Sequence, residues 1–317
     1  MTLPVLLRGR LRLPMMAAPL FIVSTPALVI AQCKAGVVGA MPSLNARTTE
    51  ALDAALTEIG AALAAHDAAH PDRKAAPFAI NLIVHRSNAR IEQDLALCVK
   101  HRVPVIITSL GARPEVNEAV HSYGGIVFHD VINDAFARKA IEKGADGLVA
   151  VAAGAGGHAG TLSPFALVGE IRRWFDGPLA LSGAIATGDA VLAAQAMGAD
   201  LAYVGSAFIA TEEANAAPDY KRMVVADHAS DIVYSDLFTG VPGNYLKNSI
   251  RAAGLDPEAL PSSDPSKMNF GDGLVKAWRD VWGSGQGIGA IDAVVPAAEL
   301  IARLDREYRA ARERLLG

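Results

Sequence analysis

One histidine of the chain stands among glycines. Residues 156–160 read Gly-Gly-His-Ala-Gly, so three glycines surround His158. Glycine lets the backbone approach a flat ring closely, and imidazole titrates near neutral pH, as general acid–base chemistry requires. A turn alone would need the glycines but not the histidine. The motif therefore predicts a catalytic role for His158; a histidine that only bonds to carbonyl groups of its own loop is the alternative.

Two further loops combine glycine with a hydroxyl group. The sequences Ser182-Gly183-Ala184 and Gly205-Ser206 each end a short apolar run. Glycine at such a place lets backbone N–H groups come close to an anion, and Ser206 adds a hydroxyl donor. Loops after consecutive strands of a barrel often hold a phosphate in this way. The pair predicts a phosphate site; glycines that only make tight turns are the alternative.

The elements that must position these residues follow a repeating pattern. Short apolar runs alternate with amphipathic segments, and near-continuous apolar runs are typical of parallel strands buried on both faces. The eight runs are residues 13–20, 37–41, 78–84, 103–110, 125–131, 147–153, 179–185 and 201–209. Eight strands alternating with helices predict an α/β fold, and eight parallel strands close into a (β/α)8 TIM barrel. A doubly wound open sheet is the alternative.

Helical segments fill the spaces between the runs. They span residues 26–35, 48–66, 89–101, 113–123, 134–143, 164–175 and 188–197. Residues with side-chain oxygens at the helix starts are predicted N-caps: Asn88, Asn133, Ser163 and Thr187.

The C-terminal third is longer than one barrel helix. We expect one structural domain with a barrel core at 1–210, a helical insertion or lid at 211–290, and a closing helix within 291–317. The insertion contains a connection rich in Gly, Pro and Asn at 239–244, a loop rich in Ser, Asp and Pro at 256–266, and a Gly-rich segment at 283–289. Residues 234–248, with Phe238, Tyr245 and Lys247, are expected to shape the substrate pocket or to pack as a helical cap on the barrel rim.

Composition limits the class of protein. The 317 residues are 51% hydrophobic and 20% charged, as in an ordinary globular protein with a large aliphatic core. A net charge of −4 argues against nucleic acid or an anionic membrane surface as the main partner. Two cysteines cannot form a disulfide framework, so a cytoplasmic location is expected. The apolar stretch at 13–31 superficially resembles a secretion signal, but three prolines interrupt it, which favours a buried strand and helix.

Barrel enzymes place their active sites at the carboxyl ends of the strands. This rule selects Ala17, Ala18, Pro19, Asn81, Thr108, Asp130, Gly156, Gly157, Ser182, Gly183, Ala184, Gly205 and Ser206 as candidate binding residues, with His158 among them. His85, His129 and Asp130 also lie near this end. The chain has no H-x-H or H-E-x-x-H spacing, however, so no metal site is predicted.

At these residues the chain resembles the nitronate monooxygenase family, also called 2-nitropropane dioxygenases. That family includes related NAD(P)H:quinone reductases and flavin-dependent enoyl-ACP reductases. Segments 14–19, 78–82, 155–160, 182–188 and 205–208 carry the resemblance. It implies a barrel that binds FMN non-covalently at its mouth, with the phosphate on Gly183, Gly205 and Ser206. The ring and ribityl chain would lie against Ala17, Ala18, Asn81 and Gly156, and His158 matches the active-site histidine of the family.

The resemblance implies oxidation of alkyl nitronates with O2 to carbonyl compounds and nitrite. The family usually has Gly-Gly-Ile and Gly-Thr-Arg-Phe in its phosphate loops, whereas this chain has Ser182-Gly-Ala and Gly205-Ser-Ala-Phe. Asp130 stands where some relatives place a lysine. A carboxylate beside the flavin would disfavour an anionic reduced flavin and an anionic nitronate, which puts the substrate in question more than the cofactor.

Two other functions stay open. One is an NAD(P)H-dependent reductase of quinones or enoyl thioesters on the same FMN barrel. The other is a barrel lyase or phosphate-ligand binder without redox activity; the eight apolar runs contain no lysine, which weakens a Schiff-base mechanism. The expected partners are a small-molecule substrate and O2, with neither nucleic acid nor membrane, and a homodimer is one assembly left open.

Overall fold

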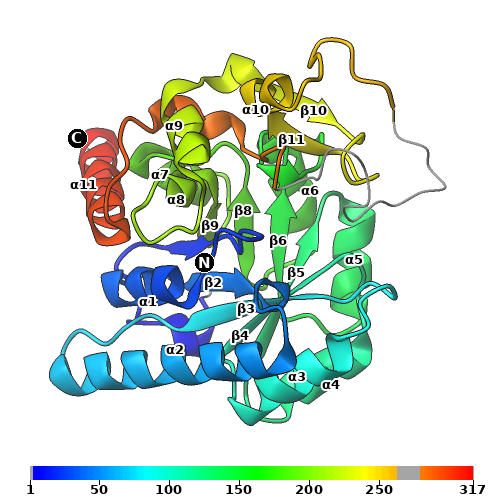
Figure 1. The fold of residues 1–317 in the computed structure, drawn as a ribbon. Coiled ribbons are helices and arrows are strands. Elements are labelled where there is room, and N and C mark those ends of the chain that lie inside the picture. Colours follow the sequence, from blue (N-terminus) through cyan, green and yellow to red (C-terminus); the bar gives the residue numbers. More distant parts are fainter. Residues whose placement is uncertain (1–2, 263–278, 317) are drawn as a thin grey trace.

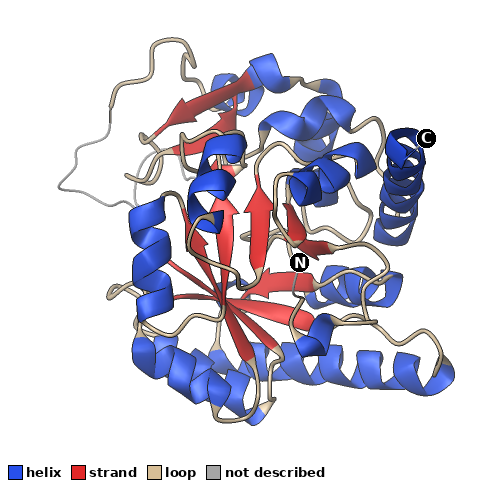
Figure 2. Cartoon of the chain, turned by 180° about the vertical axis from the view of Figure 1, so that it is seen from behind, coloured by secondary structure: helices blue, strands red, loops and turns tan. Residues whose placement is uncertain are grey.

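The computed structural model describes residues 3–262 and 279–316. Eight parallel strands lie in the centre and helices surround them (Figure 2). The strands are β1 (Met15–Ala17), β2 (Gly39–Pro42), β3 (Phe78–Ile83), β4 (Val105–Ser109), β5 (Ile126–Val131), β6 (Gly147–Val151), β8 (Leu179–Ser182) and β9 (Leu201–Val204). Each coincides with one of the eight apolar runs.

The sheet closes on itself. Its strand order is β1-β9-β8-β6-β5-β4-β3-β2, and β1 returns to β2 through a parallel bridge between Met16 and Val38. The Val38 N–H donates to the Met15 carbonyl at 3.2 Å, and the Ala17 N–H donates to the Val38 carbonyl at 2.7 Å. The predicted (β/α)8 TIM barrel is therefore confirmed, and the open-sheet alternative is wrong.

The helices follow the predicted segments closely. The barrel helices are α1 (Pro26–Ala35), α2 (Thr49–Ala69), α3 (Ile91–Lys100), α4 (Pro114–His121), α5 (Asp134–Glu142), α6 (Pro164–Arg172), α7 (Gly188–Ala196) and α8 (Ser206–Ile209). The side chains of Asn133 and Thr187 accept the predicted capping bonds. Ser163 occupies its N-cap position without that bond. The prediction for Asn88 is wrong, because α3 begins after Arg90, whose N–H Asn88 accepts at 3.0 Å.

Side chains fill the lower part of the barrel. Alternate strand residues such as Met16, Ile107 and Phe128 form one interior cluster, and Leu7 of the short helix η1 (Val5–Leu7) packs onto it. The intervening strand residues pack outward against the helices. Because this interior is packed rather than open, a ligand must bind above it, at the carboxyl ends of the strands.

Residues 211–262 and 279–290 lie together at one end of the barrel, in yellow to orange in Figure 1. They contain α9 (Pro218–Ala226), α10 (Lys247–Ala252) and the short helices η3 (Ala229–Asp231) and η4 (Gln286–Ala290). They also contain β10 (Ile232–Ser235) and β11 (Gly243–Leu246), so the expectation of a purely helical insertion is incomplete. Residues 263–266 of the predicted loop at 256–266 fall outside the described residues.

The region 234–248 builds a small core of its own. Phe238 and Tyr245 are buried with Ile250 and Val281, and the two aromatic rings meet edge to face at 4.9 Å between centroids. Lys247 is engaged with Glu258 at 2.9 Å. These three side chains therefore stabilise the insertion rather than project into an open pocket.

The last helix, α11 (Ala297–Leu316), packs against α7 and α1. An ion pair between Arg12 and Asp305, 2.9 Å apart, joins it to the segment before β1. None of the described helices has both the length and the apolar character needed to cross a membrane.

Candidate active site

The Gly-Gly-His loop is held by the insertion. Its residues Gly157–His158 form a two-residue strand, β7, which pairs antiparallel with β11 so that His158 lies opposite Gly243. A Cβ on Gly243 would lie only 2.7 Å from the Gly157 carbonyl oxygen, so the approach requires glycine. The Asn244 side chain adds a hydrogen bond from Nδ2 to the Ala155 carbonyl at 2.7 Å. The position of His158 thus depends on a segment about 85 residues later in the chain.

The His158 ring is held by the insertion. Its Nε2 lies 2.9 Å from the Thr239 hydroxyl oxygen. That hydroxyl also lies 3.0 Å from the Val241 carbonyl oxygen, which ties it to the turn before β11. Burial lowers the pKa of His158 to about 4, so the ring is neutral at pH 7 and able to accept a proton.

We expect Gly243→Ala to destabilise the protein by about 1–3 kcal/mol, because the added Cβ overpacks the β7–β11 contact. The matched control is Gly169→Ala in α6, where an added Cβ meets no heavy atom within 4 Å. That change is expected to stabilise by about 0.5–1 kcal/mol. Urea unfolding of the two variants measures both effects. An unfolding free energy of Gly243→Ala equal to that of the unmodified protein would contradict the close pairing.

The two predicted phosphate loops lie after β8 and β9. Gly183 has a φ of +145°, and a Cβ there would lie 2.8 Å from the Ala153 carbonyl oxygen, so the backbone itself requires glycine. A Cβ on Gly205 would meet only the side chains of Ala18 and Leu20, both at 3.4 Å. The backbone at position 205 therefore does not require glycine, and there is space there for a Cβ. Its loop lies beside the end of β1, where the Ala18 N–H donates to the Val204 carbonyl at 2.8 Å.

The polar groups of these loops are partly engaged. The Ala184 N–H donates to the Gly154 carbonyl at 3.2 Å, so that amide is already used. The Ser206 oxygen accepts from the Gly285 N–H at 2.8 Å, which leaves the hydroxyl proton of Ser206 for another acceptor. Ser182 ends β8 and lies one residue before Gly183.

The Gly-rich segment at 283–289 packs against the predicted site loops, although the sequence did not assign it a binding role. A Cβ on Gly156 would lie 2.7 Å from the Gly285 nitrogen, and the Gln286 N–H donates to the Gly154 carbonyl at 2.9 Å. The hydroxyl oxygen of Ser284 is buried there and has no hydrogen-bond partner among the described residues. The density of glycines in this segment was the available signal, because glycine permits such close backbone contacts.

Three side chains from neighbouring strands form a polar chain at the top of the barrel interior. Asn81 on β3 donates from Nδ2 to the Ser109 hydroxyl on β4 at 2.7 Å. Ser109 in turn donates to Asp130 Oδ2 on β5 at 2.6 Å. The second carboxyl oxygen, Oδ1, is buried without a partner. Burial raises the pKa of Asp130 to about 6, and the bond from Ser109 offsets part of that effect.

The structure does not bring the side chain of Thr108 into this chain. Successive residues of a strand point to opposite faces, and Ser109 takes the inward position. The Thr108 hydroxyl lies 2.6 Å from Nδ1 of His129, and burial lowers the pKa of His129 to about 4. Thr108 and His129 therefore form a separate buried pair on the outer side of the strands.

Tyr203, which was not among the predicted site residues, lies close enough to Asp130 to feel its charge. It lies on β9 in the interior cluster, and its pKa is raised well above the ordinary value, first by burial and then by the charge of Asp130. Ala17 ends β1 beside β9, and Ala18 and Pro19 follow it. The mouth thus has small residues on one side and the polar chain on the other.

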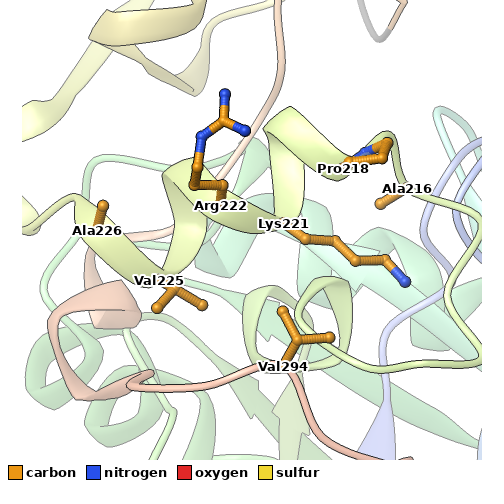
Figure 3. Close-up of a pocket in the computed structure, with 7 residues that line it drawn as sticks. All are labelled: Ala216, Pro218, Lys221, Arg222, Val225, Ala226 and Val294. Carbon is orange, nitrogen blue, oxygen red and sulfur yellow. The ribbon is translucent and has the colours of Figure 1, made fainter.

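A second feature lies away from this mouth. An open pocket of about 490 Å³ is lined by Ala216, Pro218, Lys221, Arg222, Val225, Ala226 and Val294 (Figure 3). None of these is a predicted site residue, and Lys221 is engaged with the Thr211 carbonyl at 2.6 Å. Within residues 3–262 and 279–316, no group of three or more His, Cys, Asp or Glu is placed to hold a metal ion.

Comparison with known proteins gives consistent results. A family model described as nitronate monooxygenase matches residues 9–307. The chain is 29% identical to a nitronate monooxygenase of Paraburkholderia phytofirmans, over 95% of this chain and 94% of that protein. It is 25% identical to a carboxyl-CoA dehydrogenase of Rhodococcus jostii, over 72% of this chain and 61% of that protein. The solved structure of a nitroalkane oxidase from Streptomyces ansochromogenes has the same fold, with a TM-score of 0.81, 23% identity, and coverage of 98% of this chain and 99% of that one.

Proposed function

Because the chain belongs to the nitronate monooxygenase family and is an oxidoreductase, we propose that it binds FMN at the barrel mouth and oxidises alkyl nitronates with O2. The products would be a carbonyl compound and nitrite. The observation that carries the proposal is a neutral, oriented His158 at the same end of the barrel as the two phosphate loops.

The residues present fit FMN. The free hydroxyl proton of Ser206 and the space beside Gly205 suit a phosphate, with Gly183 and Ser182 in the adjoining loop. The short side chains of Ala17, Ala18, Pro19 and Ala184 suit the approach of a flat ring, while Gly156 and Gly157 carry the loop that presents His158. The polar edge of that ring would meet Asn81, Ser109 and the unpartnered oxygen of Asp130. Thr108 would contribute through its backbone at most, because its side chain is turned outward.

When bound, FMN would take electrons from the substrate and pass them to O2. The protein's own part is positioning and proton transfer. His158, neutral at pH 7 and positioned by Thr239, would remove the α-proton of a nitroalkane or orient the nitro group of a nitronate. We propose that the described parts of the insertion, residues 211–262 and 279–290, act as a lid, since they hold His158 in place through Gly243 and Thr239.

We expect the purified protein to be yellow and to release FMN, not FAD, on heating. The proposed site takes one phosphate, and residues 3–262 and 279–316 form one barrel with its insertion and no separate dinucleotide-binding unit. An alkyl nitronate should bleach the flavin without oxygen, and readmitted O2 should restore its colour with formation of nitrite. Release of FAD, or no flavin after reconstitution with FMN, would count against the proposal.

A second candidate is an NAD(P)H-dependent reductase of quinones or enoyl thioesters on the same barrel. It is favoured by the similarity to a dehydrogenase whose name specifies a CoA thioester. The two functions differ in the reductant. Rapid anaerobic bleaching by NADH or NADPH, with slow bleaching by nitronates, would select this second function.

We also propose a cytoplasmic location, because Cys33 and Cys98 are free and buried, as in a protein that does not depend on disulfides. A homodimer is a further prediction, which analytical ultracentrifugation can test.

A further inference from the structure

The hydrogen bonds that link Asn81, Ser109 and Asp130 at the barrel mouth are donated in one direction, from Asn81 toward Asp130. Both N–H groups of the Asn81 amide are used, one on the Ile107 carbonyl at 3.0 Å and the other on Ser109 at 2.7 Å. Since a carbonyl can only accept, the orientation of the Asn81 amide is determined. Ser109 then has one proton, which goes to Asp130 Oδ2 at 2.6 Å. The two hydrogen bonds from Asn81 to Ser109 and from Ser109 to Asp130 both run toward Oδ2, so Oδ2 is the acceptor and Oδ1 is the atom left to meet a ligand.

The surroundings of Asp130 disfavour its charge. The eight barrel strands contain no lysine or arginine, and their titratable side chains are His129, Asp130 and Tyr203. His129 points to the opposite face and bonds to Thr108. Tyr203 faces the same interior and does not carry a positive charge in any state. The other inward residues near Asp130 are Asn81, Ser109 and Val151, which do not titrate. No described cation on the strands is therefore available to stabilise a buried carboxylate.

We propose that Asp130 is protonated on Oδ1 when the mouth is occupied, and that it donates this proton in a hydrogen bond to an acceptor atom of the flavin ring. The inference rests on the proposed function, since it requires FMN at this mouth. An oxidised flavin ring presents carbonyl oxygens and unprotonated nitrogens as acceptors but a single N–H donor. A neutral carboxyl can donate to these acceptor atoms, whereas a carboxylate can only accept from the one N–H group.

Two properties of the molecule support a protonated Asp130. Burial already raises the pKa of Asp130 to about 6 without a ligand. A ring placed over Oδ1 removes the remaining water, which disfavours the charged form further. A charged Asp130 beside the flavin would disfavour an anionic nitronate. A neutral Asp130 does not repel such a substrate.

The sign of the pH dependence follows from this raised pKa. Asp130 is protonated at pH values below its pKa and loses the proton as the pH rises through it. In the FMN-loaded protein the absorption spectrum of the flavin should therefore show one ionisation above pH 6, and the nitronate KM should rise on its alkaline side.

Carbon-13 NMR of the labelled aspartate carboxyl tests the proposal directly. In the FMN-free protein the Asp130 signal should titrate near pH 6, and FMN should raise that midpoint by about 1 pH unit or more. Asp130→Asn, which cannot ionise but retains an N–H donor, should bind FMN and lose the pH-dependent spectral change. The matched control is Asp134→Asn, a partly exposed carboxylate paired with Arg138 at 2.8 Å, which should leave the titration unchanged.

The outcomes separate the two proposals. Stoichiometric FMN together with an Asp130 carboxyl that is ionised at pH 7, or whose pKa falls on FMN binding, would overturn the inference alone. Absence of any bound FMN would overturn the proposed function, and the inference with it. If Asp130→Asn fails to fold, the carboxyl titration of the unmodified protein still decides the question.

Discussion

Replacing His158 with alanine is expected to leave FMN bound with a nearly unchanged visible spectrum, yet to lower turnover by roughly 10²- to 10⁴-fold. The reason is its setting: His158 is partly buried, neutral at pH 7 and hydrogen-bonded to Thr239. Steady-state kinetics with nitronates and nitroalkanes measure the loss. His121→Ala, which removes a surface histidine paired with Asp146, is the control and should retain full turnover.

The form of the substrate separates two roles of His158. A neutral nitroalkane must lose its α-proton, so its oxidation should suffer most if His158 is a base. A preformed nitronate needs no such step, and equal losses with both would indicate binding or electrostatic stabilisation instead. Because burial lowers the pKa of His158 to about 4, the fall in kcat/KM caused by its protonation should appear well below pH 6. Unchanged kinetics with every nitronate, nitroalkane, quinone and enoyl thioester tested would remove the catalytic assignment.

Gly205→Asp is expected to abolish FMN binding while the barrel still folds. The added Cβ meets Ala18 and Leu20 at ordinary contact distances of 3.4 Å, but the carboxylate lies where the phosphate is proposed. Two unit charges about 4 Å apart repel by about 4 kcal/mol at an effective dielectric constant near 20, enough to weaken binding by roughly 100-fold or more. Equilibrium titration with FMN, alongside circular dichroism of the fold, measures both parts.

The matched control for this change is Gly205→Asn, which has nearly the same shape without the charge. It should bind FMN more tightly than Gly205→Asp. Gly183→Asp is a poorer probe, because its φ of +145° and the nearby Ala153 oxygen at 2.8 Å strain any side chain there. Stoichiometric FMN in Gly205→Asp would move the phosphate to another part of the mouth.

Most of the barrel could be predicted because its strands are buried on both faces. Each apolar run overlaps one strand, and the number of runs equals the number of strands that close a barrel. The run at 201–209 was too long as a strand, since Ser206–Ile209 forms helix α8. Phe208 and Ile209 are buried in that helix, and hydrophobicity alone does not distinguish a buried helical turn from the end of a buried strand.

Burial of the strands on both faces also prevented the prediction of part of the candidate site. The run at 103–110 is apolar on both faces, so its alternation could not show whether Thr108 or Ser109 points inward. The pairing of β7 with β11 was also beyond prediction, because strands of two and four residues carry no readable period. Its one local signal was Gly243, whose missing Cβ permits the contact. The glycine-flanked histidine itself could be recognised, because its motif is contiguous.

The pairing of β1 with β9, which closes the barrel, has a consequence for synthesis on the ribosome. The first strand pairs with the last, Met15 beside Ala202, and the Arg12–Asp305 ion pair adds a still later contact. At translation rates of about 5–20 residues per second, β1 waits on the order of 10–40 s for its partner. During that time a nascent chain exposes an apolar strand edge, which other chains can pair with. Closure of this barrel is therefore a late event, and chaperones that cover the first strand would protect the chain until β9 emerges.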